Sequence, residues 1–141
     1  MEIITKNVLL VDDDKVTNFF NKRVVSKIDY FKEITTVTSG KMALDFLEDV
    51  KKGIYKKPDI IFLDLNMPAM NGWEFLDEFI KLDCKFTKSI KVVILTTSNS
   101  PDDYNRSLKI ERVNGFINKP LSQDILLNLI NTKFDFKIEY E

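Results

Sequence analysis

The chain has 141 residues, of which 44% are hydrophobic and 30% are charged, so it holds enough apolar material for one globular core and is too short for two domains. Its 21 Lys and Arg against 22 Asp and Glu give a formal charge of -1, which excludes a general electrostatic attraction to nucleic acid or anionic membrane. The lack of histidine and the single cysteine, Cys84, exclude an internal disulfide, an ordinary zinc site, and Ser-His-Asp or Cys-His catalysis.

Five short apolar runs rich in branched side chains have the length and composition of buried β-strands. In chain order they are residues 8–11, 34–37, 60–63, 92–95 and 115–117, of which the last is the weakest. Apolar residues recur with helical spacing between and after these runs. The predicted helices carry Val16, Phe19, Phe20 and Val24; Ala43, Phe46, Leu47 and Val50; Leu76, Phe79 and Ile80; and Leu121, Ile125, Leu126, Leu129 and Ile130, with a less regular helix after Pro101 around residues 104–108.

Strands and helices therefore alternate along the chain. Parallel strands need crossover connections, so this alternation predicts an α/β fold, a doubly wound five-stranded parallel sheet with helices on both faces. We expect one domain over residues 6–132, followed by a tail over residues 133–141. The tail alternates apolar and charged residues from Phe134 to Glu141, which is a strand pattern. It either packs on or beside the domain or adds a strand to the sheet edge of a partner.

The N-terminal residues 1–7 lack the basic region and the long apolar run of a signal peptide. No apolar stretch in the sequence approaches the roughly 20 residues needed to span a bilayer. We therefore expect a soluble cytoplasmic protein.

Polar residues directly follow four of the predicted strands. Asp12 and Asp13 follow the first strand, Asp64 the third, Thr96 the fourth and Lys119 the last. In an open parallel sheet the carboxyl ends of the strands meet at one edge, and a crevice opens where the strand order reverses. If the strand order is the flavodoxin-like 2-1-3-4-5, the first and third strands are neighbours and the three aspartates share one pocket.

Three carboxylates in one pocket repel one another, and a hard divalent cation makes such a cluster tolerable. Mg²⁺ favours a few carboxylates, a backbone carbonyl and several waters, and a phosphoryl group suits the open metal positions and the nearby lysine. Each residue alone also has an ordinary structural role, and for Asp14 a helix N-cap is the favoured one. These separate roles do not explain why all the polar residues fall at the same sheet edge.

The segments VLLVDDD, FLDLNMP followed by NGWEFL, VILTTS, and GFINKPL resemble the signature segments of response-regulator receiver domains, the CheY-like family, from about residue 7 to about residue 130. The resemblance implies the flavodoxin-like (βα)5 fold with strand order 2-1-3-4-5. It also implies that Asp64 is the phosphoacceptor. Mg²⁺ would be held by Asp12, Asp13, Asp64 and the backbone carbonyl of Asn66.

The resemblance assigns roles to the remaining strand ends as well. Thr96 would hydrogen-bond the phosphoryl group and Lys119 would pair with it, which completes the catalytic set. Phe116 occupies the aromatic switch position and would move inward when Thr96 is drawn toward the phosphate. Pro120 is expected to follow a cis peptide bond.

The resemblance further implies a single-domain response regulator of a two-component or phosphorelay system, which catalyses only its own phosphorylation and dephosphorylation. The donor would be a phosphohistidine on a sensor histidine kinase or a histidine phosphotransfer protein. About 130 residues of receiver leave no room for an output domain, so we expect the output to be contact with a downstream protein. We expect no direct binding of nucleic acid and no membrane insertion, and the chain is compatible with a homodimer.

Two other functions remain open from the sequence. Residues 12–16, DDDKV, also fit the DxDx[TV] segment of haloacid-dehalogenase-type phosphatases, with Asp12 as nucleophile. That family needs a further acidic motif after the lysine, and only Asp124 and the last predicted helix follow it. A receiver-like adaptor that is never phosphorylated is the third class, and the intact set of Asp13, Asp64, Thr96 and Lys119 argues against it.

Overall fold

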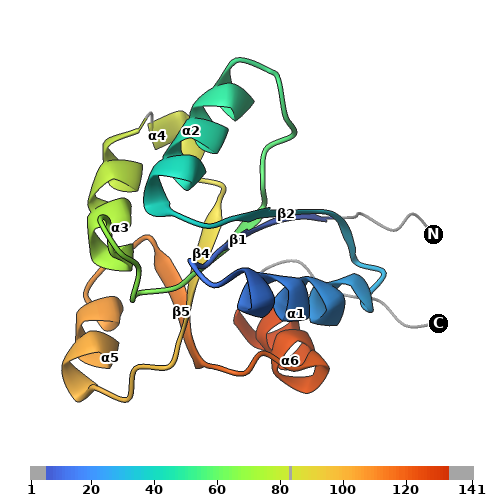
Figure 1. Cartoon of the computed structure of the whole chain (residues 1–141), viewed down its shortest axis with the longest axis vertical. Helices are drawn as coiled ribbons and strands as arrows, with labels where there is room; N and C mark the ends of the chain where they lie inside the picture. Colours follow the sequence, from blue (N-terminus) through green and yellow to red (C-terminus); the bar gives the residue numbers. More distant parts are fainter. Residues whose placement is uncertain (1–5, 83, 134–141) are drawn as a thin grey trace.

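A single parallel sheet organises the chain. The structure, a computed structural model, describes residues 6–82 and 84–133, and in this part it has five strands in the order β2-β1-β3-β4-β5 with six helices around them (Figure 1). The strand order and the doubly wound fold confirm the prediction. The elements are β1 (Lys6–Val11), α1 (Lys15–Ser26), β2 (Phe31–Val37), α2 (Gly40–Lys51), β3 (Ile60–Leu63), α3 (Gly72–Lys81), α4 (Cys84–Thr87), β4 (Lys91–Thr96), α5 (Pro101–Leu108), β5 (Val113–Asn118) and α6 (Gln123–Lys133).

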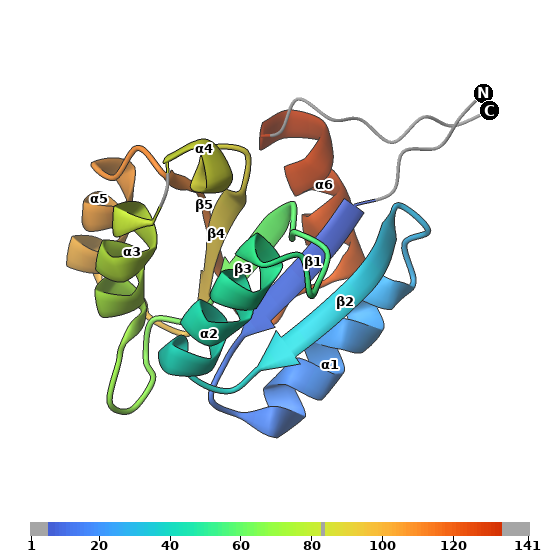
Figure 2. The same ribbon diagram turned by 90° about the horizontal axis from the view of Figure 1, so that it is seen from above.

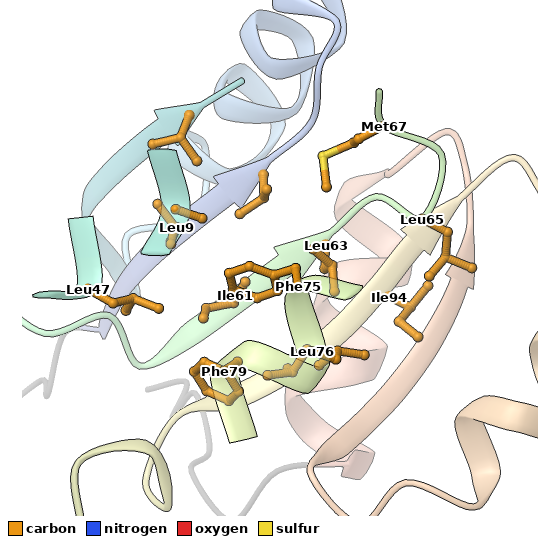
Figure 3. Packing of buried hydrophobic residues seen from close by; sticks show 14 of the residues in the cluster. Leu9, Leu47, Ile61, Leu63, Leu65, Met67, Phe75, Leu76, Phe79 and Ile94 are labelled. Atoms are coloured by element: carbon orange, nitrogen blue, oxygen red, sulfur yellow. The ribbon is translucent and has the colours of Figure 1, made fainter. Parts of the chain in front are cut away.

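The helices form two layers that cover opposite faces of the sheet (Figures 1 and 2). Alternate residues of each central strand point to opposite faces, so Leu9 of β1 and Ile61 of β3 pack with α2 and α3, whereas Leu10 and Phe62 pack with α1 and α6. Figure 3 shows the first of these cores, in which Phe75 of α3 lies among side chains of the sheet. Both faces of the central strands are buried, as their continuous apolar runs require.

All five predicted strands exist, and all except β3 extend beyond the predicted apolar runs. The predicted helices exist as well, and the short helix α4 between α3 and β4 was not predicted. The predicted tail was residues 133–141. Its first residue, Lys133, ends α6, and residues 134–141 lie outside the described residues, so both interpretations of the tail stay open. None of the helices that the structure describes is both long and apolar enough to cross a membrane.

Helix α1 departs from its predicted orientation. Three of the four residues that defined its apolar spacing are exposed: Val16 by 73%, Phe19 by 65% and Phe20 by 54%. The fourth, Val24, packs against the core. Asn18 and Asn21 instead lie on the buried side of the helix. The apolar pattern therefore predicted the helix correctly and its buried face only in part, and a hydrophobic surface remains exposed near the N-terminus of α1.

Candidate functional site

Backbone hydrogen bonds continue the sheet past the strand ends and fix the backbone of the residues that follow the strands. The N–H of Asp12 donates to the last residue of β2 at 3.2 Å, and the N–H of Asp64 donates to the last residue of β1 at 3.0 Å. The N–H of Lys119 donates to the carbonyl oxygen of Thr96 at 2.8 Å. The sheet itself thus holds four of the predicted site residues at the carboxyl ends of β1, β3, β4 and β5: Asp12, Asp64, Thr96 and Lys119.

The three predicted acids meet in one cluster. Each of Asp12, Asp13 and Asp64 offers a carboxylate oxygen, and these oxygens lie within 4.8 Å of one another. Asp12 and Asp64 are buried, whereas Asp13 lies on the exposed side. The Nζ atom of Lys119 lies 2.6 Å from Asp12 Oδ2 and 3.5 Å from Asp64 Oδ1. Three carboxylates and one ammonium leave an excess of negative charge that a divalent cation neutralises, so this donor set fits a hard divalent metal.

Burial and charge shift two of the ionisable groups in this cluster. Burial raises the pKa of the Asp64 carboxyl above its ordinary value, and the nearby Lys119 ammonium opposes this effect without cancelling it. Burial alone lowers the pKa of Lys119, but the carboxylates of Asp12 and Asp64 outweigh it, so the pKa lies above its ordinary value. Lys119 therefore provides a positive charge beside Asp64 at neutral pH.

Asp14 has the capping role that the sequence predicted. Its Oδ1 atom accepts a hydrogen bond from the N–H of Val16 at 3.0 Å, which caps α1. Its own N–H donates to Asp12 Oδ1 at 2.9 Å. The turn that starts α1 therefore also orients a carboxylate of the acidic cluster.

Thr96 and Phe116 lie on adjacent strands, near the same end of the sheet. Thr96 is buried, and its Oγ1 atom accepts a hydrogen bond from the N–H of Ser98 at 3.1 Å. Phe116 is half-buried in β5, and its ring meets that of Tyr104 edge to face with centroids 5.5 Å apart. These positions are compatible with the predicted switch, whose movement stays a prediction.

The loop from β3 to α3 is tightly folded around the site. The N–H of Asn66 approaches Asp64 Oδ1 at 3.4 Å, and the metal-binding role of the Asn66 carbonyl stays a prediction. A Cβ atom on Gly72 would lie 2.6 Å from the Asp64 backbone oxygen, so this close approach requires glycine. Ala69 has φ of 67°, a left-handed conformation that the sequence did not signal. The Lys119–Pro120 bond is cis, as expected.

Three residues near the site were missed by the sequence reasoning. Asn18 donates from Nδ2 to the backbone oxygens of Asp12 at 2.9 Å and of β2 at 3.0 Å. Trp73 donates from Nε1 to Asp103 Oδ1 at 3.3 Å, which links α3 to α5. An asparagine within an amphipathic helix was a visible signal for Asn18, whereas the Trp73–Asp103 contact spans 30 residues and carried none.

The fold and the site together define a CheY-like, flavodoxin-fold domain with an acidic pocket at the carboxyl edge of its sheet. Residues 8–131 match the family model described as response regulator receiver domain. The chain belongs to this family, whose members are phosphoacceptor signalling proteins. Family membership leaves the dehalogenase-type phosphatase interpretation without support.

Individual relatives agree with this assignment. The response regulator Rcp1 of Synechocystis is 32% identical over 95% of this chain and 90% of its own length. A two-component response regulator from Cytophaga hutchinsonii has a structure with a TM-score of 0.82 at 34% identity, covering 91% of this chain and 96% of the other. The Mn²⁺-bound form of Rcp1 has a TM-score of 0.75 at 28% identity, covering 96% and 99%. The chain is thus similar in sequence and in structure to response regulators over nearly its whole length.

Proposed function

We propose that this response regulator accepts a phosphoryl group on Asp64 from a phosphohistidine donor, in a Mg²⁺-dependent reaction that switches its contacts with other proteins. The observation that carries the proposal is the cluster itself. The carboxylate oxygens of Asp12, Asp13 and Asp64 lie within 4.8 Å of one another, and the Lys119 ammonium contacts two of the three acids.

The residues of the cluster would divide the work between them. Mg²⁺ would be held by Asp12, Asp13, Asp64 and the carbonyl of Asn66. When bound, it would neutralise negative charge where the phosphoryl group binds. The Mn²⁺-bound form of the relative Rcp1 supports a divalent ion here. Lys119 adds a fixed positive charge on the other side of Asp64.

The transfer step needs one nucleophile and one leaving group. A carboxylate oxygen of Asp64 attacks phosphorus in line, the new O–P bond forms, and the P–N bond of the donor breaks. The electron pair of that bond returns to the imidazole nitrogen of the donor. Lys119 stabilises the charge on the phosphoryl oxygens, and the Thr96 hydroxyl donates a hydrogen bond to one of them. Because this hydroxyl accepts from Ser98, its own proton is free to do so.

The exposed face of α1 supports a protein donor. Val16, Phe19 and Phe20 are exposed on the helix that begins two residues after Asp13. Apolar side chains exposed together mark contact surfaces more often than isolated ones do. A donor that brings its phosphohistidine to Asp64 would therefore bury this face.

A direct test uses the native chain with Mg²⁺ and acetyl phosphate, or with a phosphohistidine protein as donor. Intact mass should show one added phosphoryl group, which is lost in Asp64→Asn and on chelation of the metal. Asp77→Asn, an exposed acid on α3, is the matched control and should be phosphorylated like the native chain. No adduct on the native chain would leave a receiver-like adaptor as the function, and an adduct that survives Asp64→Asn would overturn Asp64 as the phosphoacceptor.

A further inference from the structure

A side-chain bridge joins α3 to the loop that follows β4. The carboxylate of Asp103, in the first turn of α5, accepts a hydrogen bond from Trp73 Nε1 at 3.3 Å and another from Ser98 Oγ at 2.6 Å. The guanidinium carbon of Arg106 lies 4.5 Å from the centre of the Trp73 ring. We call Trp73, Asp103 and Ser98 the Asp103 bridge.

The bridge continues to the phosphoryl site through the backbone. Ser98 donates its N–H to Thr96 Oγ1 at 3.1 Å, and its carbonyl oxygen accepts from Asn118 Nδ2 at 2.8 Å. Asn118 directly precedes Lys119. Ser98 is therefore fixed at once to Thr96, to the end of β5 and, through Asp103, to α3.

Asp103 has a role beyond that of an ordinary first-turn acid. Such acids usually stabilise the N-terminus of their own helix, yet the N-cap of α5, Ser100, makes no side-chain capping bond. Both hydrogen bonds of the Asp103 carboxylate go to other elements, the β4–α5 loop and α3. A half-buried carboxylate that accepts from two elements holds them in one relative position.

We infer that Asp103 and Trp73 are positioning residues for the reaction at Asp64, because they restrain Ser98, and with it Thr96, in the unphosphorylated arrangement. The inference rests on the proposed function. Movement of Thr96 toward a phosphoryl group displaces Ser98, which lies two residues further on, and stretches its bond to Asp103. The bridge thus sets how readily the phosphorylated arrangement is reached, and loosening it favours that arrangement.

Two variants loosen the bridge by different amounts. Asp103→Ala removes both hydrogen bonds, and Trp73→Phe keeps an aromatic ring under Arg106 while removing only the indole N–H. Asp102→Ala is the matched control, because Asp102 is an exposed acid in the same turn of α5. It carries the same change of charge and side-chain length without a bond to α3.

The test measures binding of beryllofluoride, a phosphoryl analogue, to each protein with saturating Mg²⁺ by calorimetry. Two hydrogen bonds lost from the unphosphorylated arrangement should tighten binding about tenfold in Asp103→Ala, and one should tighten it about threefold in Trp73→Phe. Asp102→Ala should bind like the native chain. Damage to the fold would weaken binding, so a gain in affinity separates a restraint from a structural role.

Trp73 supplies a second readout, because it is the only tryptophan of the chain. Its emission should change when beryllofluoride binds to the native protein and the bridge breaks. Unchanged emission, or equal or weaker binding in Asp103→Ala, overturns the inference while leaving phosphorylation of Asp64 intact. Absence of any phosphoryl adduct on the native chain overturns the proposed function, and the inference with it.

Discussion

Replacement of Asp13 by Asn should stabilise the protein without metal and weaken its response to Mg²⁺. Asp13 is the exposed member of a cluster in which three carboxylates face a single ammonium, that of Lys119. Its charge is repelled by two carboxylates and attracted by one lysine. Asn has nearly the same shape and no charge, so the substitution removes mainly electrostatic terms.

The separation of the oxygens gives the size of the effect. Two unit charges 4.8 Å apart, the largest separation in the cluster, repel by about 0.9 kcal/mol in water and by about 3.5 kcal/mol at an effective dielectric constant of about 20. Asp13 is exposed, so the lower value is the better guide. Lys119 contacts the other two carboxylates and so weakens part of their repulsion of Asp13, and the net gain in the free energy of unfolding should be about 1 kcal/mol.

The response to Mg²⁺ should change in the opposite direction. At a free concentration 100 times the dissociation constant, binding to the folded state stabilises the native chain by about 2.7 kcal/mol. If loss of the Asp13 carboxylate weakens binding tenfold, the variant gains about 1.4 kcal/mol at the same concentration. The difference of about 1.3 kcal/mol exceeds the gain of about 1 kcal/mol without metal, so at this concentration the metal cancels the advantage of the variant.

Urea unfolding followed by circular dichroism, with chelator and with Mg²⁺, measures both quantities in one series. Asp14→Asn is the control, because Asn caps helices as well as Asp does and Asp14 lies outside the cluster of ligand oxygens. It should respond to Mg²⁺ like the native chain. An Asp13→Asn protein that is less stable than native in chelator, or that keeps the full metal response, would refute the reasoning.

Three further predictions test other parts of the structure. Gly72→Ala places a Cβ 2.6 Å from a backbone oxygen and should lower the free energy of unfolding by about 2 kcal/mol. Gly115→Ala is the control, because its Cβ meets only side chains at 3.4 Å or more, and it should change this free energy much less. Equal losses of the two variants in urea unfolding would contradict the prediction. Joint replacement of Phe19 and Phe20 by Ala should change the free energy of unfolding by less than about 0.5 kcal/mol. It should slow phosphotransfer from a phosphohistidine protein and leave the rate of phosphorylation by acetyl phosphate unchanged. A parallel fall in both rates would count against α1 as the donor surface. Lys119→Met should leave Mg²⁺ binding largely intact in calorimetry and abolish the change in tryptophan emission on phosphorylation, so a native emission change in this variant would contradict the assigned coupling.

The strand ends explain why so much of the site was predictable. A parallel sheet aligns the carboxyl ends of its strands, so a polar residue that follows an apolar run has a known place once the strand order is known. Asp12, Asp64 and Lys119 required nothing more than this rule and the order 2-1-3-4-5. The site therefore follows from local sequence patterns and one global feature of topology.

The Asp103 bridge could not be predicted in the same way. Its contacts depend on how the loop after β4 turns and on the position of α5 relative to α3, and neither is encoded by hydrophobic periodicity. In the sequence, Asp103 resembles any acid at the start of a helix. Trp73 resembles any aromatic residue of the core, and it is indeed only 8% exposed. Only in the folded protein does one hydrogen bond join them.

The partly wrong prediction of the buried face of α1 has a functional explanation. Its inward side carries Asn18, whose amide group holds the backbone of Asp12 against β2, a task that an apolar side chain cannot perform. Its outward side carries Phe19 and Phe20, whose exposure costs solubility without strengthening the core. A helix used only for packing would bury its large apolar side chains, as α1 does with Val25 alone among its fully buried residues. The inverted pattern is explained if one side of α1 positions a ligand of the acidic cluster and the other receives the protein that delivers the phosphoryl group.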